Sequence, residues 1–128
     1  MIQKYTTLGF LLVTCTHFLG AQVEDEACLP PAKKVLKQIE TAKNAGDAKT
    51  AVLSFSEAIS SAPDNAMAYY EYGMYAYAQA MKYYNQNPNP AAGDKSMAKA
   101  EEMFLAALER CSDYHSNCTY YLGVINYS

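Results

Sequence analysis

The sequence contains no tryptophan, only two histidines and no block of lysine or arginine residues. Ten basic and 13 acidic residues give a formal net charge of −3, whereas nucleic-acid-binding domains concentrate positive charge on one face. We therefore expect no nucleic acid partner. Because 51% of the residues are hydrophobic, the chain is too apolar for a disordered region, and 128 residues are enough for one domain.

The sequence also lacks the residue combinations that catalysis, cofactors and metal ions require. It has no glycine-rich phosphate-binding loop, no carboxylate pair with a pocket signature, and no nucleophile close to a base. No two cysteines have CxxC spacing, and His115 alone cannot complete a metal-binding set. We interpret Asp113 and His115 as a helix cap and a surface residue. The expectation is a non-catalytic protein without a metal or cofactor.

Residues 1–21 have the features of a signal peptide. Lys4 precedes an apolar run over 8–19, and small residues come directly before Gln22. The run is shorter than the roughly 20 residues that a transmembrane helix needs. We expect cleavage before Gln22, export, and no membrane span in the remaining chain. The alternatives are a short N-terminal anchor, a buried helix, or a lipoprotein signal ending at Cys15.

The exported chain keeps three cysteines, Cys28, Cys111 and Cys118. Export leads to an oxidising compartment, so we expect one disulfide and one remaining thiol. Cys111 and Cys118 flank a short helix connection and are the nearest pair in sequence, which favours a disulfide between them. The alternative is that all three are separate, small, buried side chains.

After a lead segment at 22–30, residues 31–128 have the periodicity of helices. No segment alternates with period two, so we expect an all-α fold. Apolar spacing predicts helices over 32–44, 48–61 and 66–85, from Asp94 or Ser96 to about 111, and from about 116 onward. Gly46, Pro63 and the loop 86–93 (QNPNPAAG) separate them. Asp47 and the pair Asp64-Asn65 are the expected N-caps.

The expected helices contain an internal repeat. The pattern Ala51-x3-Phe55-x2-Ala58 recurs as Ala100-x3-Phe104-x2-Ala107, and Tyr69-x2-Tyr72-Gly73 is matched by Thr119-x2-Leu122-Gly123. This ordered set resembles the tetratricopeptide repeat (TPR), in which antiparallel helix pairs stack into a solenoid. The resemblance implies about five helices, with alanine and glycine allowing close approach and the two phenylalanines filling the spaces between pairs. Its last unit has only one helix, so we expect the domain to be incomplete at its C-terminus, with a downstream domain of the same protein as one candidate partner.

The tyrosines of the third expected helix form the basis of the functional prediction. One stripe, Tyr69, Tyr72, Gly73, Ala76, Ala80 and Tyr83, matches the stacking face of the family. Alignment with TPR proteins implies that a second stripe and part of the last helix line a concave groove for a protein or peptide partner. These groove residues are Met67, Tyr70, Met74, Tyr77, Met81, Tyr120, Val124 and Tyr127. A methionine and tyrosine surface suits apolar or extended segments.

The expected function is therefore that of an exported interaction or scaffold module. The resemblance to periplasmic TPR proteins of Gram-negative bacteria implies a periplasmic or secreted location, with outer-membrane association as a further option. The alternative is a structural or self-associating helical domain whose aromatic stripe packs only within its own chain, because helices that are apolar on all sides are commonly enclosed.

Overall fold

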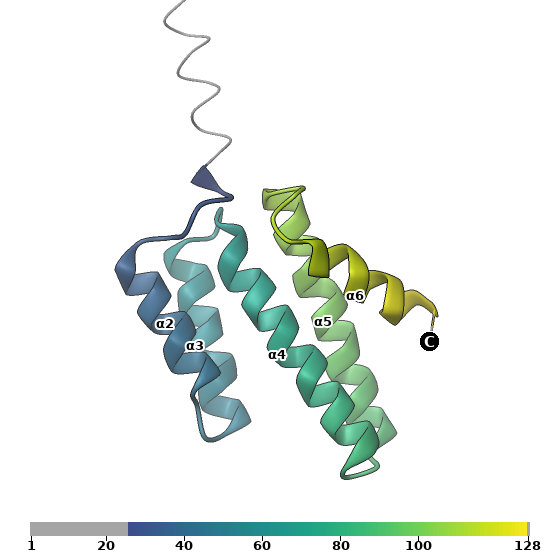
Figure 1. Cartoon of the computed structure of the whole chain (residues 1–128). Helices are drawn as coiled ribbons and strands as arrows, with labels where there is room; N and C mark the ends of the chain where they lie inside the picture. The colour runs from purple at the N-terminus through teal and green to yellow at the C-terminus, as the bar shows by residue number, and fades with distance from the viewer. Residues whose placement is uncertain (1–25, 128) are drawn as a thin grey trace, which may run out of the picture.

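The structure, a computed structural model, describes residues 26–127 (Figure 1). In this range the chain forms five helices and no strand, which confirms the all-α prediction. The helices are α2 (Lys33–Lys43), α3 (Ala48–Ser61), α4 (Ala66–Asn85), α5 (Pro90–Arg110) and α6 (Ser116–Tyr127). The predicted signal peptide lies outside the described residues.

The helices are arranged as two antiparallel pairs and a final single helix. Helices α2 and α3 form a short pair, α4 and α5 form a longer one, and α6 lies across the longer pair (Figure 1). Both predicted caps are confirmed: the Asp47 carboxylate accepts the Thr50 backbone N–H at 2.8 Å, and the Asn65 side chain accepts that of Met67 at 3.0 Å. Such side-chain acceptors satisfy N–H groups that have no partner within the helix.

Helix α5 begins earlier than predicted. We expected a loop up to residue 93 and a cap at Asp94 or Ser96, but the helix starts at Pro90 and the Asn89 side chain accepts the Ala92 backbone N–H at 3.2 Å. The prediction was wrong because proline and glycine were interpreted as helix breakers. Proline is favoured in the first helical turn, where its missing N–H costs nothing. Gly93 lies within the first turns of this helix, where its backbone contacts the Tyr84 ring and leaves no room for a side chain.

Two phenylalanines occupy the equivalent spaces between successive helices. Phe55 and Phe104 are both fully buried. Phe55 of α3 stacks on Tyr72 of α4 with ring centroids 5.1 Å apart, and Phe104 of α5 stacks on Tyr121 of α6 at 5.7 Å. The two ring pairs have the same spacing in sequence, so the internal repeat is present in the packing. This register aligns Tyr72 with Tyr121, whereas the sequence comparison aligned it with Leu122.

Gly73 allows the close approach of α4 and α5. A Cβ atom at this position would lie 2.8 Å from two carbons of the Phe104 ring, which is closer than side-chain contacts permit. Ala100 and Ala107 of α5 are fully buried on either side of that phenylalanine. The small residues of the repeat therefore make the space that the aromatic ring fills, as the sequence predicted.

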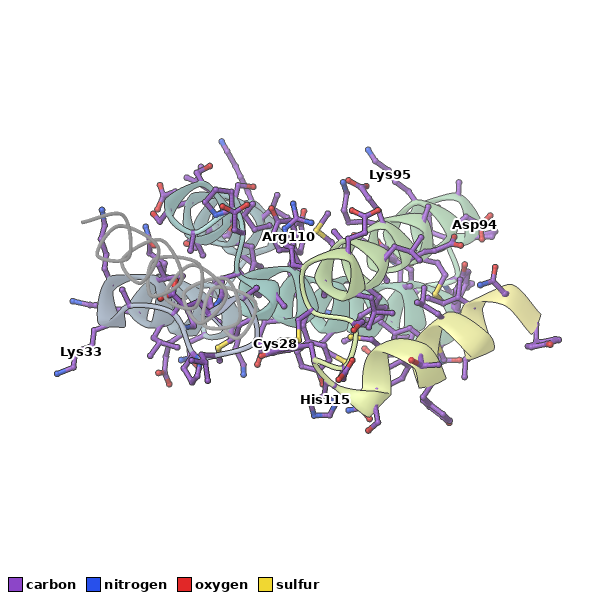
Figure 2. All side chains as sticks on the ribbon, turned by 90° about the horizontal axis from the view of Figure 1, so that it is seen from above. Cys28, Lys33, Asp94, Lys95, Arg110 and His115 are labelled. Carbon is purple, nitrogen blue, oxygen red and sulfur yellow. A yellow bond between two sulfur atoms is a disulfide. The ribbon has the colours of Figure 1, made fainter. Side chains whose placement is uncertain are left out.

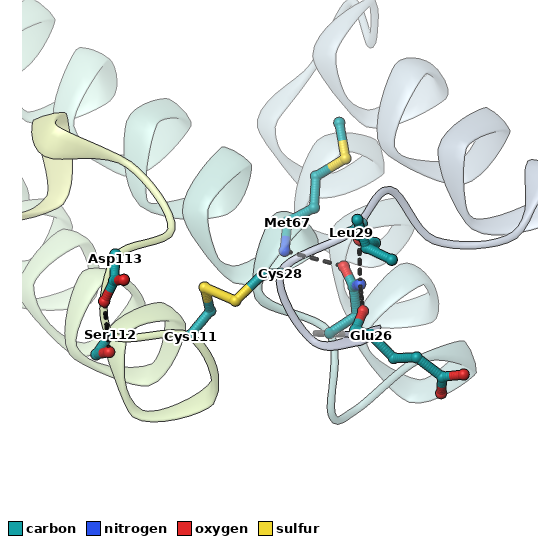
Figure 3. The surroundings of a disulfide bond; sticks show 8 residues. Glu26, Cys28, Leu29, Met67, Cys111, Ser112 and Asp113 are labelled. Carbon is teal, nitrogen blue, oxygen red and sulfur yellow. Dashed lines mark hydrogen bonds between the residues drawn. A yellow bond between two sulfur atoms is a disulfide. The ribbon is translucent and has the colours of Figure 1, made fainter. Parts of the chain in front are cut away.

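The disulfide joins Cys28 to Cys111, not Cys111 to Cys118 as predicted (Figure 3). Cys118 is a free thiol, buried on the inner side of α6. The prediction was wrong because it used proximity in sequence alone. The side chain of Cys118 points from α6 into the core, whereas Cys111 lies at the end of α5, next to the lead segment. The Cα atoms of Cys28 and Cys111 are 5.3 Å apart, within the usual range for a disulfide.

The lead segment also makes hydrogen bonds to the start of α4. The Ala66 backbone N–H donates to the carbonyl oxygen of Ala27 at 3.0 Å, and the Asn65 amide donates to that of Leu29 at 2.7 Å. Asn65 thus caps α4 with its side-chain oxygen and binds the lead with its side-chain nitrogen. The described part of the lead is consequently attached to the bundle at both α4 and α5.

Replacing Gly73 with alanine tests the contact between α4 and Phe104. We expect Gly73→Ala to lower the free energy of unfolding by about 1–2 kcal/mol, because overpacking a closed core outweighs the gain in helix propensity. Gly123→Ala is the matched control, since no described atom outside its own stretch of helix lies within 4 Å of its Cβ position. This control should be neutral or up to about 1 kcal/mol more stable. Equal denaturation midpoints for both variants would contradict the packing.

Removing the disulfide should destabilise the domain strongly. The bond closes a loop with a sequence separation of 83 residues. A disulfide that closes a loop of this size stabilises the folded protein by about 4 kcal/mol, because it lowers the entropy of the unfolded chain. We expect Cys28→Ser to unfold at a markedly lower denaturant concentration, while Cys118→Ser, which leaves the bond intact, should have a smaller effect. Peptide mapping without reduction should recover Cys28 linked to Cys111; a Cys111–Cys118 peptide would overturn the assignment.

Candidate functional site

The predicted groove residues divide into a covered half and an open half. At the start of α4, Tyr70 is only 8% exposed and Met67 is partly buried against the core. Further along the helix, Met74 and Tyr77 are half-buried and Met81 is exposed. Helix α6 causes the difference, because its first turn lies over Tyr70. The structure therefore does not bring the eight predicted residues together as one surface.

Tyr70 is the centre of the contact between α4 and α6. Its hydroxyl accepts a hydrogen bond from the Asn117 side-chain amide at 3.1 Å. The His115 ring stacks on its face with centroids 4.8 Å apart, and the Tyr114 ring meets it edge-on at 5.5 Å. Tyr70 also contacts Phe104, at 6.2 Å between centroids. These contacts hold α6 against the bundle and make Tyr70 a packing residue.

Burial shifts the titration of the groups around Tyr70. It raises the pKa of the Tyr70 hydroxyl, raises that of Tyr114 to about 12, and raises that of the Cys118 thiol. All three groups therefore stay protonated at neutral pH. A neutral cluster of this kind can donate hydrogen bonds, but it offers neither a thiolate nor a phenolate for nucleophilic chemistry.

The open half of the stripe lines a hollow between α4 and α6, which we call the α4–α6 hollow. It has a volume of about 460 Å³, and its apolar lining comes from Met74, Tyr77, Met81 and Tyr121. The Tyr77 and Tyr121 rings lie 4.6 Å apart and form its inner wall. Lys82, Asn85 and Gln86 provide its polar lining. Three predicted groove residues thus share one concave surface.

A second hollow of about 680 Å³ lies beside the first and shares Tyr77 and Met81 with it. Its other apolar contacts come from Met97 of α5 and from Val124 and Ile125 of α6, while Asp94 and Glu101 add negative charge. The two hollows together give a continuous methionine and tyrosine surface across the far end of the α4–α5 pair.

Two predicted groove residues lie elsewhere. Tyr120 and Tyr127 line neither hollow and are 64% and 95% exposed. The sequence analysis missed Tyr121, Met97 and Ile125, which do line them. Tyr121 could have been predicted from the repeat, because its separation from Phe104 in the sequence equals that of Tyr72 from Phe55. For Met97 and Ile125 no such signal exists, because their position depends on how α6 crosses α5.

His115 is exposed, as interpreted from the sequence, but it caps α6 in place of Asp113, which we expected to be the cap. Its Nδ1 atom accepts the Asn117 backbone N–H at 3.1 Å, and Asp113 accepts a hydrogen bond from the Ser112 hydroxyl. Within residues 26–127 there is no group of three or more His, Cys, Asp or Glu side chains placed to hold a metal ion. None of the described helices combines the length and the apolar character needed to cross a membrane.

The sequence and the structure were compared with known proteins. No family model, no curated protein and no solved structure matches this chain. The TPR resemblance therefore remains a prediction based on the repeat, and the interpretation of the site depends on the geometry described above.

Replacing Tyr70 distinguishes a packing residue from a partner-binding one. We expect Tyr70→Ala to lower the free energy of unfolding by at least about 2 kcal/mol, because it leaves a cavity and removes the acceptor of Asn117. Tyr120→Ala, at an exposed position of α6, should change stability by no more than about 0.5 kcal/mol.

Hydrogen exchange provides the second measurement for these two variants. Amides of α6 should exchange faster in Tyr70→Ala and at an unchanged rate in Tyr120→Ala, because only the first variant loosens the helix from α4. If Tyr70→Ala left both stability and α6 exchange unchanged, α6 would not be docked as described.

Proposed function

We propose that this protein is a non-catalytic interaction module of TPR-like architecture. In this proposal the α4–α6 hollow and the hollow beside it hold an apolar or extended segment of a protein partner. The observation that carries the proposal is the continuous surface of Met74, Tyr77, Met81 and Tyr121 left open beyond the point where α6 covers α4.

The packing supports the TPR-like part of the proposal. The Phe55–Tyr72 and Phe104–Tyr121 stacks place α4 and α6 in equivalent positions after α3 and α5. Viewed from above, α2, α4 and α6 lie toward one side of the molecule, and α3 and α5 toward the other (Figure 2). This arrangement is the one expected when each helix pair buries its apolar face against the next.

The chemistry of the surface supports a protein segment as the partner. Methionine side chains adapt to different shapes, and tyrosine rings provide large contact areas with little loss of conformational entropy. Lys82 lines the α4–α6 hollow, and Asp94 and Glu101 line the hollow beside the α4–α6 hollow. A segment bound across both hollows would therefore have positive charge near one end and negative charge near the other. We infer an apolar segment with a basic flank at the α5 end.

The disulfide supports export of the protein. A bond between Cys28 and Cys111 forms and persists in oxidising compartments, which is consistent with an extracellular or periplasmic location. The lead segment that carries Cys28 directly follows the predicted signal peptide.

Self-association is the second candidate function, because Tyr120 and Tyr127 lie exposed on α6 outside both hollows. An exposed aromatic pair on one helix is a contact surface that a second copy of the chain can use. In that case sedimentation would show a dimer that Tyr127→Ser abolishes, and the hollows would not be involved.

Selection of peptides from a displayed library tests the proposed groove. We expect the purified domain to enrich apolar segments with a basic flank, and Met81→Glu to weaken their binding at least tenfold, because it places an unpaired charge against the apolar segment. Leu105→Glu is the matched control, since Leu105 is exposed on α5 and lines neither hollow. The selected peptides should bind this control as they bind the original protein.

Two results would contradict the proposed groove. One is selected peptides that bind Met81→Glu and Leu105→Glu equally well. The other is loss of binding only on replacement of Tyr120 or Tyr127, which would move the interaction surface to the outside of α6.

A further inference from the structure

A separate cavity lies between α3, α4 and α5, on the side of the bundle away from α6. It has a volume of about 310 Å³ and a mostly apolar lining. Val52 of α3, Tyr72, Tyr75 and Ala76 of α4, and Lys95 and Lys99 of α5 line it. Figure 2 shows Lys95 on the opposite side of the molecule from His115 and α6. The cavity shares no lining residue with the α4–α6 hollow or its neighbour.

We propose that this cavity binds a small anionic amphiphile, with its apolar body against Val52, Tyr72, Tyr75 and Ala76 and its carboxylate beside Lys95 and Lys99. Its volume is at the lower end of the range of ligand sites, about 300–1,000 Å³, and such sites combine apolar walls with a few polar groups. An apolar body with one negative end matches both features of the lining.

The charges around the cavity favour an anion. Lys95 and Lys99 are one helical turn apart on α5, so their side chains lie on the same face. No carboxylate of residues 26–127 lies within ion-pair distance of the Lys95 ammonium group, and Lys99 pairs with Glu102 at 2.6 Å. Lys95 is therefore available to a ligand, and Lys99 is held in part by Glu102.

The acidic groups on the neighbouring elements already have partners. The Asp47 carboxylate, before α3, accepts hydrogen bonds from the backbone and the hydroxyl of Thr50 at 2.8 and 2.7 Å. Asp94, next to Lys95 in sequence, accepts the Tyr84 hydroxyl at 2.6 Å. Both carboxylates keep their negative charge, but neither forms an ion pair with Lys95 or Lys99, and these two lysines are the only charged residues in the lining of the cavity.

The tyrosines of the cavity add hydrogen-bond donors. Burial raises the pKa of Tyr72 and of Tyr75, so both hydroxyls keep their protons at neutral pH. A neutral phenol donates to a carboxylate, and such charge-assisted hydrogen bonds are stronger than neutral ones. The ring faces meanwhile contact the apolar body of the ligand.

Titration with decanoate, followed by backbone amide NMR shifts, tests this site. We expect saturable shifts around residues 48–52, 72–76 and 95–99, and much weaker binding of decanol and of decyltrimethylammonium. Lys95→Gln should raise the Kd about fivefold, which is the upper value for one exposed ion pair. Glu102→Gln should lower the Kd, because it releases Lys99 from its partner.

Matched variants separate this site from general apolar binding. Lys33→Gln with Lys34→Gln removes two exposed charges from α2 and should leave the Kd unchanged. Ala48→Leu adds volume at the exposed edge of the cavity and should weaken binding, whereas Ala91→Leu, on the exposed first turn of α5 outside the cavity, should not.

Three outcomes would overturn the proposal: equal affinity for decanol, shifts centred on Met81 and Tyr121 instead, or an unchanged Kd in Lys95→Gln with Lys99→Gln. The site does not depend on the proposed protein groove. Met81→Glu should leave decanoate binding intact, and Lys95→Gln should leave peptide binding intact, so the failure of one proposal can be recognised separately from the failure of the other.

Discussion

The close contact between Gly73 and the Phe104 ring determines how the longer helix pair is built. The ring occupies the space where a Cβ atom would stand, so α4 and α5 approach closely at this point. The same ring stacks on Tyr121 and so fixes the position of α6. Phe55 makes the equivalent stack on Tyr72 between the two pairs. Two buried rings thus join all three units of the fold.

The position of α6 decides which part of the aromatic stripe is accessible. The connection before α6 covers Tyr70 through Tyr114 and His115, and the first turn of α6 covers it through Asn117. Further along, α4 extends beyond this cover and leaves Met81 exposed. One periodic pattern on one helix therefore serves both for packing and for an open surface. The sequence presented burial and partner binding as alternatives; the structure buries the first half of the stripe and leaves part of the second half exposed, which is the half that we propose for partner binding.

The two faces of the α4–α5 pair differ in chemistry. On the α6 side, methionine and tyrosine line wide hollows with acidic groups at the α5 end. On the opposite side, a smaller apolar cavity carries two lysines. A flexible apolar surface suits a peptide segment, whereas a compact cavity with a positive edge suits a small anion. Helix α3 forms one wall of the smaller cavity through Ala48 and Val52, whereas the wide hollows on the α6 side are lined by α4, α5 and α6.

Helical periodicity was sufficient to predict the all-α fold and the ends of α3 and α4, and the capping residue types predicted the caps at Asp47 and at Asp64-Asn65. The resemblance of the internal repeat to the TPR predicted that Phe55 and Phe104 fill the spaces between helices, and both are fully buried. These features depend on local spacing and side-chain size, and both can be read from the sequence. The tertiary structure decided the Cys28–Cys111 disulfide, the early start of α5, and the division of the groove residues into covered and open sets. The disulfide depends on the lead lying beside the end of α5, and the division of the groove residues depends on α6 lying over Tyr70. The early start of α5 depends on the Asn89 cap and on the room that Gly93 leaves for the Tyr84 ring. The spacing of residues along the chain does not predict such tertiary contacts, because they depend on the direction in which each helix packs after the connection before it.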